Sequence, residues 1–222
     1  MKKSILFLLF SCLMSLQAMA QIVALKAEAR DTAYVRTILG RSEKNISALQ
    51  LTGDLFQNVR NIVANRYFEL NDIYAERDTL VNQAKRNFTG DEKNRAIDAA
   101  RAQCDSKLYR SHFAFPAQLS LFLNEEQIEA VKDGVTMGVV KVTYEANLDM
   151  IPTLTDEEKA QILAWLKEAR ELALDAESSK KKHEVFGKYK GRINNYLSAR
   201  GYDLVKEREA WYERVKARGG KL

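Results

Sequence analysis

The sequence is short of cysteine, proline and histidine, and the shortage of cysteine excludes two kinds of stabilisation. Only two cysteines occur in 222 residues, and Cys12 lies in an apolar leading segment that is expected to be removed. Cys104 alone then remains, so an intramolecular disulfide and a four-thiolate metal site are both excluded. Because Cys104 lies at helical spacing between Ala100 and Leu108, we predict a small, buried side chain there. Packing must therefore stabilise the fold.

The sequence also lacks the common short motifs of catalysis and cofactor binding. It contains no Gly-x-Ser-x-Gly nucleophile elbow, no phosphate-binding glycine loop and no dinucleotide fingerprint. His183 and Glu184 begin a zinc-binding His-Glu-x-x-His motif, but Gly187 stands where the second histidine would be. We therefore expect no cofactor and no metal.

With two prolines, Pro116 and Pro152, the sequence has few points at which a helix must end. Apolar residues spaced three and four apart predict one helix over about residues 54–86, and a second helix begins at Asp91 after a break at residues 87–90. These features predict an all-α protein, a bundle of about six helices with a long N-terminal antiparallel helical hairpin.

Short polar motifs mark further helix starts. Asn124 with Gln127 and Thr155 with Glu158 have the spacing of a capping box, in which the first side chain accepts a backbone N–H and the fourth reaches back. Asp203 is positioned to cap a last helix. These residues therefore predict where three helices begin.

The C-terminal half is predicted to be helical as well. Amphipathic spacing predicts a helix over residues 155–176 and another that starts at residue 178 or 179. Residues 134–150 fit two descriptions, since their apolar positions alternate as in a strand and also share one helical face. We predict a helix there, and the β-branched content leaves a short strand as the alternative.

The leading segment has the anatomy of a signal peptide. Two lysines are followed by the apolar run 5–16 and then by Ala18-Met19-Ala20, which is a small-x-small cleavage site. We predict a signal peptide over residues 1–20 that is cleaved near Ala20, and a single helical domain over residues 21–222. The protein is then periplasmic or secreted. The apolar run 5–16 is too short to span a bilayer, and the sequence has no second apolar run of that length or longer.

The basic character of the sequence is concentrated at its C-terminal end. Residues 21–179 carry 20 Lys and Arg against 25 Asp and Glu, whereas residues 180–222 carry 13 against 5. In an exported protein such a segment meets anionic lipid, lipopolysaccharide or uronic-acid polymer, so no nucleic-acid partner is expected. A solvated helix face is the alternative interpretation.

The densest group of polar and aromatic residues lies between residues 182 and 203. Gly187 and Gly191 each cost a helix about 1 kcal/mol relative to alanine, so a close backbone approach or a ligand would account for them. Arginine and lysine bind carboxylates, asparagine amides pair with hydroxyls, and tyrosine presents a face to a sugar ring. Helix packing with buried hydrogen bonds is the alternative. The candidate ligand-binding residues are Lys188, Tyr189, Lys190, Arg192, Asn194, Asn195, Tyr196 and Tyr202.

The same segment carries a family resemblance. Residues 188–197, with Asp133-Gly134-Val135-Thr136, Met150-Ile151-Pro152 and Glu168-Ala169-Arg170-Glu171, resemble an exported domain-of-unknown-function family of Bacteroidetes-type bacteria. That family is encoded beside polysaccharide-utilisation genes and is described as sugar-binding. The resemblance covers nearly the whole mature chain. It implies an extracytoplasmic location and a carbohydrate ligand, and it implies no catalytic residues.

Three functions are consistent with these observations. The first is an accessory protein that binds carbohydrate, with an acidic polysaccharide among the candidates. The second is a periplasmic helical chaperone or adaptor, because residues 123–127 resemble the Leu-Thr-x-x-Gln repeat of helical stress chaperones. The third is a polysaccharide lyase or hydrolase. A hydrolase needs two carboxyl groups that face each other, for which Asp133, Glu145 and Asp149 are the candidates. The sequence makes no prediction of oligomeric state.

Overall fold

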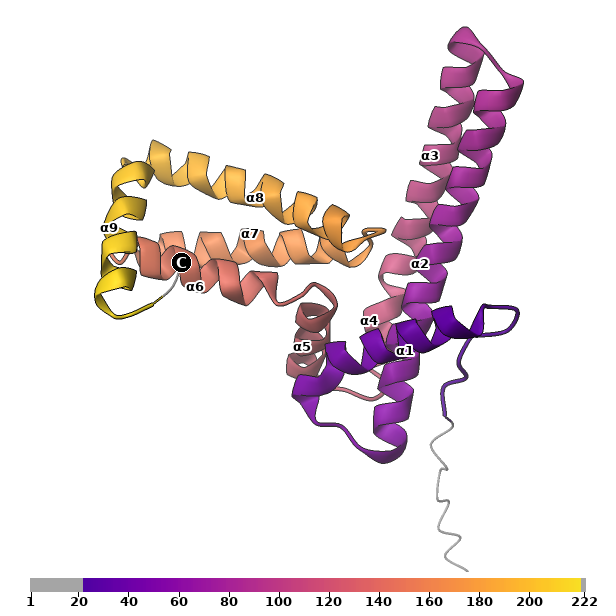
Figure 1. Ribbon diagram of the computed structural model, residues 1–222, viewed down its shortest axis with the longest axis horizontal. Coiled ribbons are helices and arrows are strands. Elements are labelled where there is room, and N and C mark those ends of the chain that lie inside the picture. The colour runs from indigo at the N-terminus through magenta and orange to yellow at the C-terminus, as the bar shows by residue number, and fades with distance from the viewer. Residues whose placement is uncertain (1–21, 221–222) are drawn as a thin grey trace, which may run out of the picture.

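A computed structural model describes residues 22–220 (Figure 1), so the predicted signal peptide lies outside the described residues. Between residues 22 and 220 the chain forms helices and no β-strand, which confirms the all-α prediction. The elements are α1 (Thr32–Ile46), a 3₁₀ helix (Ser47–Leu49), α2 (Gly53–Asn87), α3 (Gly90–His112), α4 (Ala114–Leu119), α5 (Glu125–Val135), α6 (Val139–Met150), α7 (Asp156–Leu174), α8 (Ser179–Ala199) and α9 (Leu204–Ala217).

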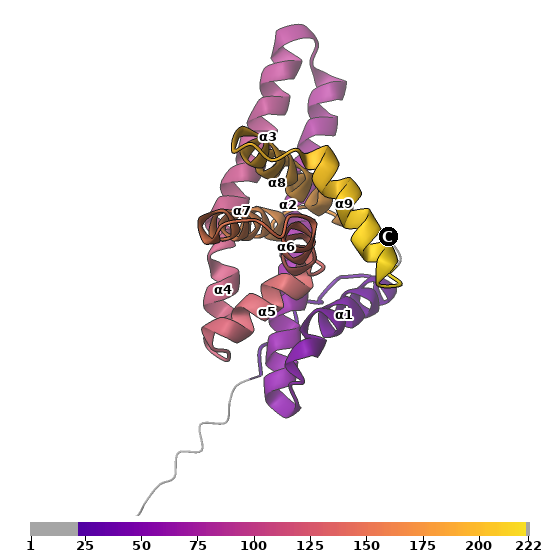
Figure 2. The ribbon, with the colours of Figure 1, turned by 90° about the vertical axis from the view of Figure 1, so that its left-hand side faces the viewer.

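The long helical hairpin is formed by α2 and α3, which pack antiparallel and project from the rest of the molecule (Figures 1 and 2). The bounds of α2 and the start of α3 lie within a residue of the predicted ones, because the apolar spacing along α2 is regular and the break is short. Gly90 adopts a φ of +54° at the start of α3, a conformation that glycine tolerates best. Cys104 is 4% exposed on α3, as predicted.

The N-terminal part of the chain surrounds the base of this hairpin. Helices α1, α4 and α5 pack around a core that includes Ile46, Ile62 and Leu119. The extended segment before α1 is held by asparagines of α2. The Asn61 Nδ2 donates to the Val23 carbonyl (2.8 Å), and the Asn65 side chain accepts the Lys26 N–H (2.8 Å). These bonds explain why polar side chains are buried on α2.

Helices α6 to α9 form a second layer with a core of its own. In this layer α7 and α8 lie antiparallel, α6 packs beside α7, and α9 crosses the end of the layer (Figures 1 and 2). The core includes Ile162, Leu166, Phe186 and Ile193, each at most 1% exposed. The hydrophobic core is thus divided between the hairpin end of the molecule and the α6–α9 layer.

Residues 134–150 are helical and not a strand. The helix is interrupted at residues 136–138, where Met137 and Gly138 both have positive φ angles, +63° and +65°. The described residues contain nine α-helices, whereas about six were predicted from the sequence. The number is higher because this break divides one segment and because α1 and the short α4 lack a long apolar stripe. None of these helices combines the length and the apolar character needed to cross a membrane.

The predicted helix caps are present. Asn124 with Gln127 and Thr155 with Glu158 both form complete capping boxes at the starts of α5 and α7. The Asp203 carboxylate accepts the backbone N–H groups of the first turn of α9. These local motifs fix where α5, α7 and α9 begin.

Candidate functional site

The structure does not gather the eight predicted ligand-binding residues into one site. Because seven of them follow one another along about three turns of α8, they point in different directions around the helix axis. Lys188 borders a cleft against α3, whereas Lys190 and Asn194 line a smaller cavity of about 330 Å³ between α6, α8 and α9. Asn195 is exposed. The remaining four contact other helices.

Arg192, Tyr189 and Tyr196 pack against α7. The Arg192 guanidinium carbon lies 4.5 Å from the centroid of the Trp165 ring and 6.0 Å from that of Tyr189. The Tyr196 ring meets Trp165 edge to face, with centroids 5.1 Å apart. These contacts agree with the alternative interpretation, in which this segment serves helix packing.

Tyr202 contributes to a hydrogen-bonded cluster at the start of α7. Its hydroxyl donates to Glu158 Oε2 (2.8 Å), and Arg200 Nε donates to Glu158 Oε1 (2.7 Å). The Thr155 backbone N–H, the Tyr202 hydroxyl and the Arg200 guanidinium lower the pKa of Glu158 to about 2. Tyr202 thus helps to hold the Glu158 carboxylate in place at the start of α7.

One of the two explanations offered for the glycines of α8 is wrong. A Cβ atom built on Gly187 or Gly191 meets nothing within 4 Å, so no close backbone approach selects glycine there. The close approach occurs at Gly134 of α5, where a Cβ would lie 1.9 Å from the Asn45 carbonyl oxygen of α1.

The three carboxylates considered for catalysis do not face one another. Asp133 pairs with Arg170 (2.7 Å), Asp149 accepts from Trp211 Nε1 (2.6 Å), and Glu145 is exposed on α6. The first two carboxylates therefore stabilise contacts between helices.

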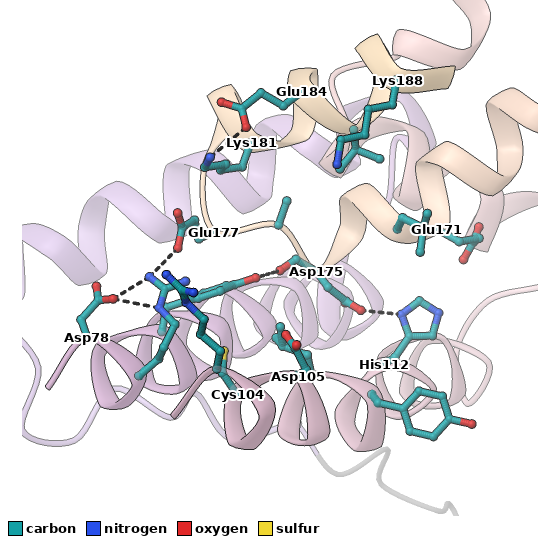
Figure 3. A pocket seen from close by; sticks show the side chains of 18 of the residues that line it. Asp78, Cys104, Asp105, His112, Glu171, Asp175, Glu177, Lys181, Glu184 and Lys188 are labelled. Carbon is teal, nitrogen blue, oxygen red and sulfur yellow. Dashed lines mark hydrogen bonds and ion pairs between the residues drawn. The ribbon is translucent and has the colours of Figure 1, made fainter. Parts of the chain in front are cut away.

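A larger cleft lies between the helical hairpin and the α7–α8 pair (Figure 3). This hairpin cleft has a volume of about 980 Å³. Four elements of structure supply its walls, namely α2, α3, the end of α7 with the connection that follows, and the first turns of α8. The lining residues are Tyr74, Arg77, Asp78, Val81, Arg101, Cys104, Asp105, Leu108, Tyr109, His112, Phe113, Glu171, Leu172, Asp175, Ala176, Glu177, Lys181, Glu184, Val185 and Lys188.

One wall of the hairpin cleft carries exposed apolar side chains. Tyr109 is 72% exposed, Phe113 is 62% exposed, and Leu172, which also lines the cleft, is 55% exposed. The Tyr109 and Phe113 rings lie four residues apart with centroids separated by 6.0 Å. Large apolar side chains that gather in a concave site and face water are typical of a binding surface.

The base of the hairpin cleft is organised by Asp175. Its carboxylate accepts from Arg66 Nη2 (2.5 Å) and lies 2.8 Å from His112 Nδ1, while its backbone carbonyl accepts from the Tyr74 hydroxyl (2.6 Å). Arg66 is only 5% exposed, so Asp175 neutralises a buried cation. Burial raises the pKa of Tyr74, which keeps its hydroxyl protonated as a donor.

The contact with Asp175 also selects the tautomer of the neutral His112 ring. An ionised carboxylate can only accept, so Nδ1 carries the proton and Nε2 is left with a free lone pair when the ring is neutral. The His112 side chain is 20% exposed at the cleft. Phe113 meets the His112 ring edge to face, with centroids 4.9 Å apart.

The charges around the rim of the hairpin cleft are largely paired with one another. Arg77 contacts both Asp78 (2.6 Å) and Glu177 (2.8 Å), and Lys181 contacts Glu184 (2.8 Å; Figure 3). These pairs leave little net charge for a ligand to neutralise. The cleft therefore offers mainly ring faces and hydrogen-bonding groups to solvent.

Comparison with known proteins assigns the chain to a family. Residues 35–217 match the family described as Protein of unknown function (DUF3826). The chain belongs to the DUF3826 family. No curated protein matches the chain.

Sequence reasoning missed the hairpin cleft of this DUF3826 protein. Its residues come from helices far apart in the sequence, and Asp175 lies 109 positions from Arg66. One local signal was available, since Tyr109 and Phe113 place two aromatic rings on one face of an otherwise polar helix. Such a pair on a polar helix predicts either a packing contact or an exposed binding surface.

Proposed function

We propose that this protein is an exported accessory protein that binds carbohydrate in the hairpin cleft. The observation that carries the proposal is the exposed pair Tyr109 and Phe113 on the wall of a cleft of about 980 Å³. The export part of the proposal is supported by the lysines, apolar run and cleavage site of residues 1–20.

The chemistry of the cleft suits a sugar. Aromatic faces pack against the apolar C–H faces of pyranose rings, and carboxylates accept hydrogen bonds from sugar hydroxyls. Asp105 is an exposed carboxylate of this cleft, and Lys188 is an exposed donor on the opposite wall. Because the rim charges are paired, we propose that the ligand is recognised mainly through its rings and hydroxyls and that binding depends little on salt.

Calorimetric titration with neutral and uronate-containing oligosaccharides tests this proposal. Tyr109→Ala and Phe113→Ala should each weaken binding about fivefold, since an aromatic contact contributes about 1 kcal/mol. Neither change should lower stability by much, because both side chains face water. Tyr212→Ala on α9 is the matched control, as Tyr212 is 40% exposed and does not line the cleft.

Two outcomes would contradict the proposal. Oligosaccharide binding that survives both substitutions would place the glycan elsewhere on the protein. No binding across the panel, with suppression of the aggregation of an unfolded client at equimolar protein, would favour the chaperone or adaptor function.

The His112–Asp175 pair favours a second candidate function, a polysaccharide lyase. In such a reaction Nε2 would take the proton from the carbon next to a uronate carboxylate, a C=C bond would form as the bond to the glycosidic oxygen breaks, and that oxygen would take the proton back from the imidazolium and leave as an alcohol. The carboxylate of Asp175 would stabilise the imidazolium that results.

The test of the lyase is the appearance of an unsaturated product from uronate polymers, followed by its ultraviolet absorbance. His112→Gln should abolish product formation and leave binding unchanged, whereas His183→Gln, at an exposed histidine outside the cleft, should alter neither. Product that persists in His112→Gln, or no product with the original protein, would remove this candidate.

A further inference from the structure

A second cleft lies where the α6–α9 layer meets the base of the hairpin. We call it the junction cleft; its volume is about 920 Å³. Tyr74, Ala176 and Glu177 line both this cleft and the hairpin cleft, so the two lie on either side of the connection between α7 and α8. Helices α1, α2 and the start of α8 supply most of its other lining residues.

The charges that line the junction cleft are predominantly positive. Arg41 and Lys44 of α1 and Lys182 of α8 are its cations, and Glu177 is its one carboxylate. Glu177 is already paired with Arg77, at 2.8 Å. Within residues 22–220, none of the three cations has a carboxylate oxygen within 4.0 Å, although the chain forms many ion pairs elsewhere. The cleft therefore carries uncompensated positive charge.

Lys182 is the most unusual of these cations because it is buried. Its side chain is 5% exposed, and its Nζ donates to the Val135 carbonyl at 2.9 Å. An ammonium group has three N–H donors, so two remain for a ligand. Burial, and secondarily the charge of Arg41, lowers the pKa of Lys182 to about 8.

Between residues 22 and 220, the other two buried cations are neutralised. Arg170, 2% exposed, contacts the carboxylates of Glu129, Asp133 and Glu171. Arg66, 5% exposed, contacts Glu69 and Asp175. Burying a cation without an anion is costly, and the fold avoids that cost at both arginines. Lys182 is the exception within the described residues, and its position on a cleft allows a ligand to supply the missing anion.

Further donors surround the same point. Lys182 Nζ and the Arg41 guanidinium carbon each lie 5.5 Å from the centroid of the Tyr67 ring. The Tyr67 hydroxyl accepts from Asn45 Nδ2 (2.8 Å), which leaves its own proton free to donate. Ser178 and Ser179 bring the N-terminal end of α8, a helix of 21 residues, to the cleft, and the partial positive charge there adds to the cationic field.

We propose that the junction cleft binds a small oxyanion, a carboxylate, sulfate or phosphate group, between Lys182 at its buried end and Arg41 and Lys44 on α1. The bound anion neutralises Lys182 in the way that the carboxylates of Glu129, Asp133 and Glu171 neutralise Arg170. This site is separate from the proposed carbohydrate site and does not depend on it, since none of these three cations lines the hairpin cleft.

Calorimetric titration of the purified protein tests the oxyanion site. Sodium sulfate, sodium phosphate and galacturonate are the probes, with sodium chloride at matched ionic strength and neutral galactose as controls. Binding of sulfate or phosphate alone identifies an inorganic ligand, and binding of galacturonate but not galactose identifies a carboxylate on a sugar. Either result supports the site, and the absence of binding by all three anions would overturn it.

Three variants locate the site. Lys182→Met, which keeps the length and apolar stem of the side chain, should weaken anion binding at least tenfold. The double substitution Arg41→Gln and Lys44→Gln should weaken it to a similar extent, and it decides the question if Lys182→Met does not fold, because both residues are exposed. Lys180→Met is the control, an exposed lysine on the same helix that does not line the cleft, and its binding should be unchanged.

Anion binding that is equal in all variants would overturn the proposal. The outcome is also independent of the glycan experiment, because Phe113→Ala should leave anion binding intact and Lys182→Met should leave binding of neutral oligosaccharides intact.

Discussion

The hairpin cleft and the junction cleft share the connection between α7 and α8 but differ in how their charges are arranged. In the hairpin cleft His112 contacts Asp175, Lys181 contacts Glu184, and apolar rings face water. In the junction cleft the three cations have no carboxylate within 4.0 Å among residues 22–220, and one of them, Lys182, is buried. Two cavities of similar volume thus favour different ligands, one with apolar ring faces and one with negative charge.

The number of charged residues in a cleft therefore says little about the charge of its ligand. The hairpin cleft has more ionisable residues than the junction cleft, yet most of them serve to stabilise the fold. A charge is available to a ligand only when the fold has not already neutralised it. Substitutions at paired and at available charges should therefore differ in their effect on stability.

The largest effect is expected from Asp175→Ala in the hairpin cleft. This change leaves the buried Arg66 with Glu69 as its one remaining carboxylate, whose side chain is 45% exposed, and should lower the free energy of unfolding in urea by about 3 kcal/mol. Asp105→Ala, at an exposed carboxylate of the same cleft, should change it by less than about 0.5 kcal/mol. Equal effects would show that the paired charges of this cleft do not stabilise the fold.

A smaller effect of opposite sign is expected from the pH dependence of Lys182. Four charged or titratable groups face it, Arg41 from α1, Tyr67 and Arg66 from α2, and Asp175 after α7. The pKa of Lys182 falls from an ordinary value of 10.5 to about 8 in the folded protein. Between these values the unfolded chain binds more protons, so the Lys182 contribution to the free energy of unfolding should rise with pH, by about 2 kcal/mol.

Comparison with Lys182→Met isolates this contribution. The pH dependence of the original protein alone would not isolate it. Several tyrosines, among them Tyr67, have raised pKa values, and their titration lowers the free energy of unfolding at high pH. Urea titrations of both proteins from pH 7 to pH 10 give the difference directly. A difference that is flat, or that falls with pH, would show that Lys182 is not an uncompensated buried cation.

The smallest effect is expected from Arg192→Ala, on the side of α8 that packs against α7. The guanidinium lies over Trp165 and is half exposed, so its loss should lower stability by less than about 1 kcal/mol. Oligosaccharide affinity, measured by calorimetry, should not change. A large loss of affinity with unchanged stability would restore the site predicted from the sequence.

Local features of the fold could be predicted from the sequence. The bounds of α2 and the start of α3 follow from apolar spacing and a short break, and the capping boxes at Asn124 and Thr155 depend on residues three positions apart. The burial of Cys104 follows from the same spacing. These features depend on interactions within one or two helical turns, which a single sequence records directly.

The site could not be predicted in the same way. Residues that are neighbours in a helical segment spread around the helix, so Lys188 and Lys190 reach different cavities although they are two positions apart. Conversely, Arg66 and Asp175 meet only because α2 packs against the end of α7. Whether a charge is paired or available is a property of tertiary packing, and the buried state of Lys182 left no trace in the charge pattern of residues 180–222.

Chemical-shift mapping of the ¹⁵N-labelled protein tests the separation of the two clefts most directly. A neutral oligosaccharide should shift amide signals around Tyr109 and Phe113 of α3, and sulfate or galacturonate should shift those around Arg41 of α1 and Lys182 at the start of α8. Two separate sites would be contradicted if both kinds of ligand shifted the same amide signals. The carbohydrate site in the hairpin cleft would be contradicted if the oligosaccharide shifted signals around Arg192 and Asn195 and left those of α3 unchanged.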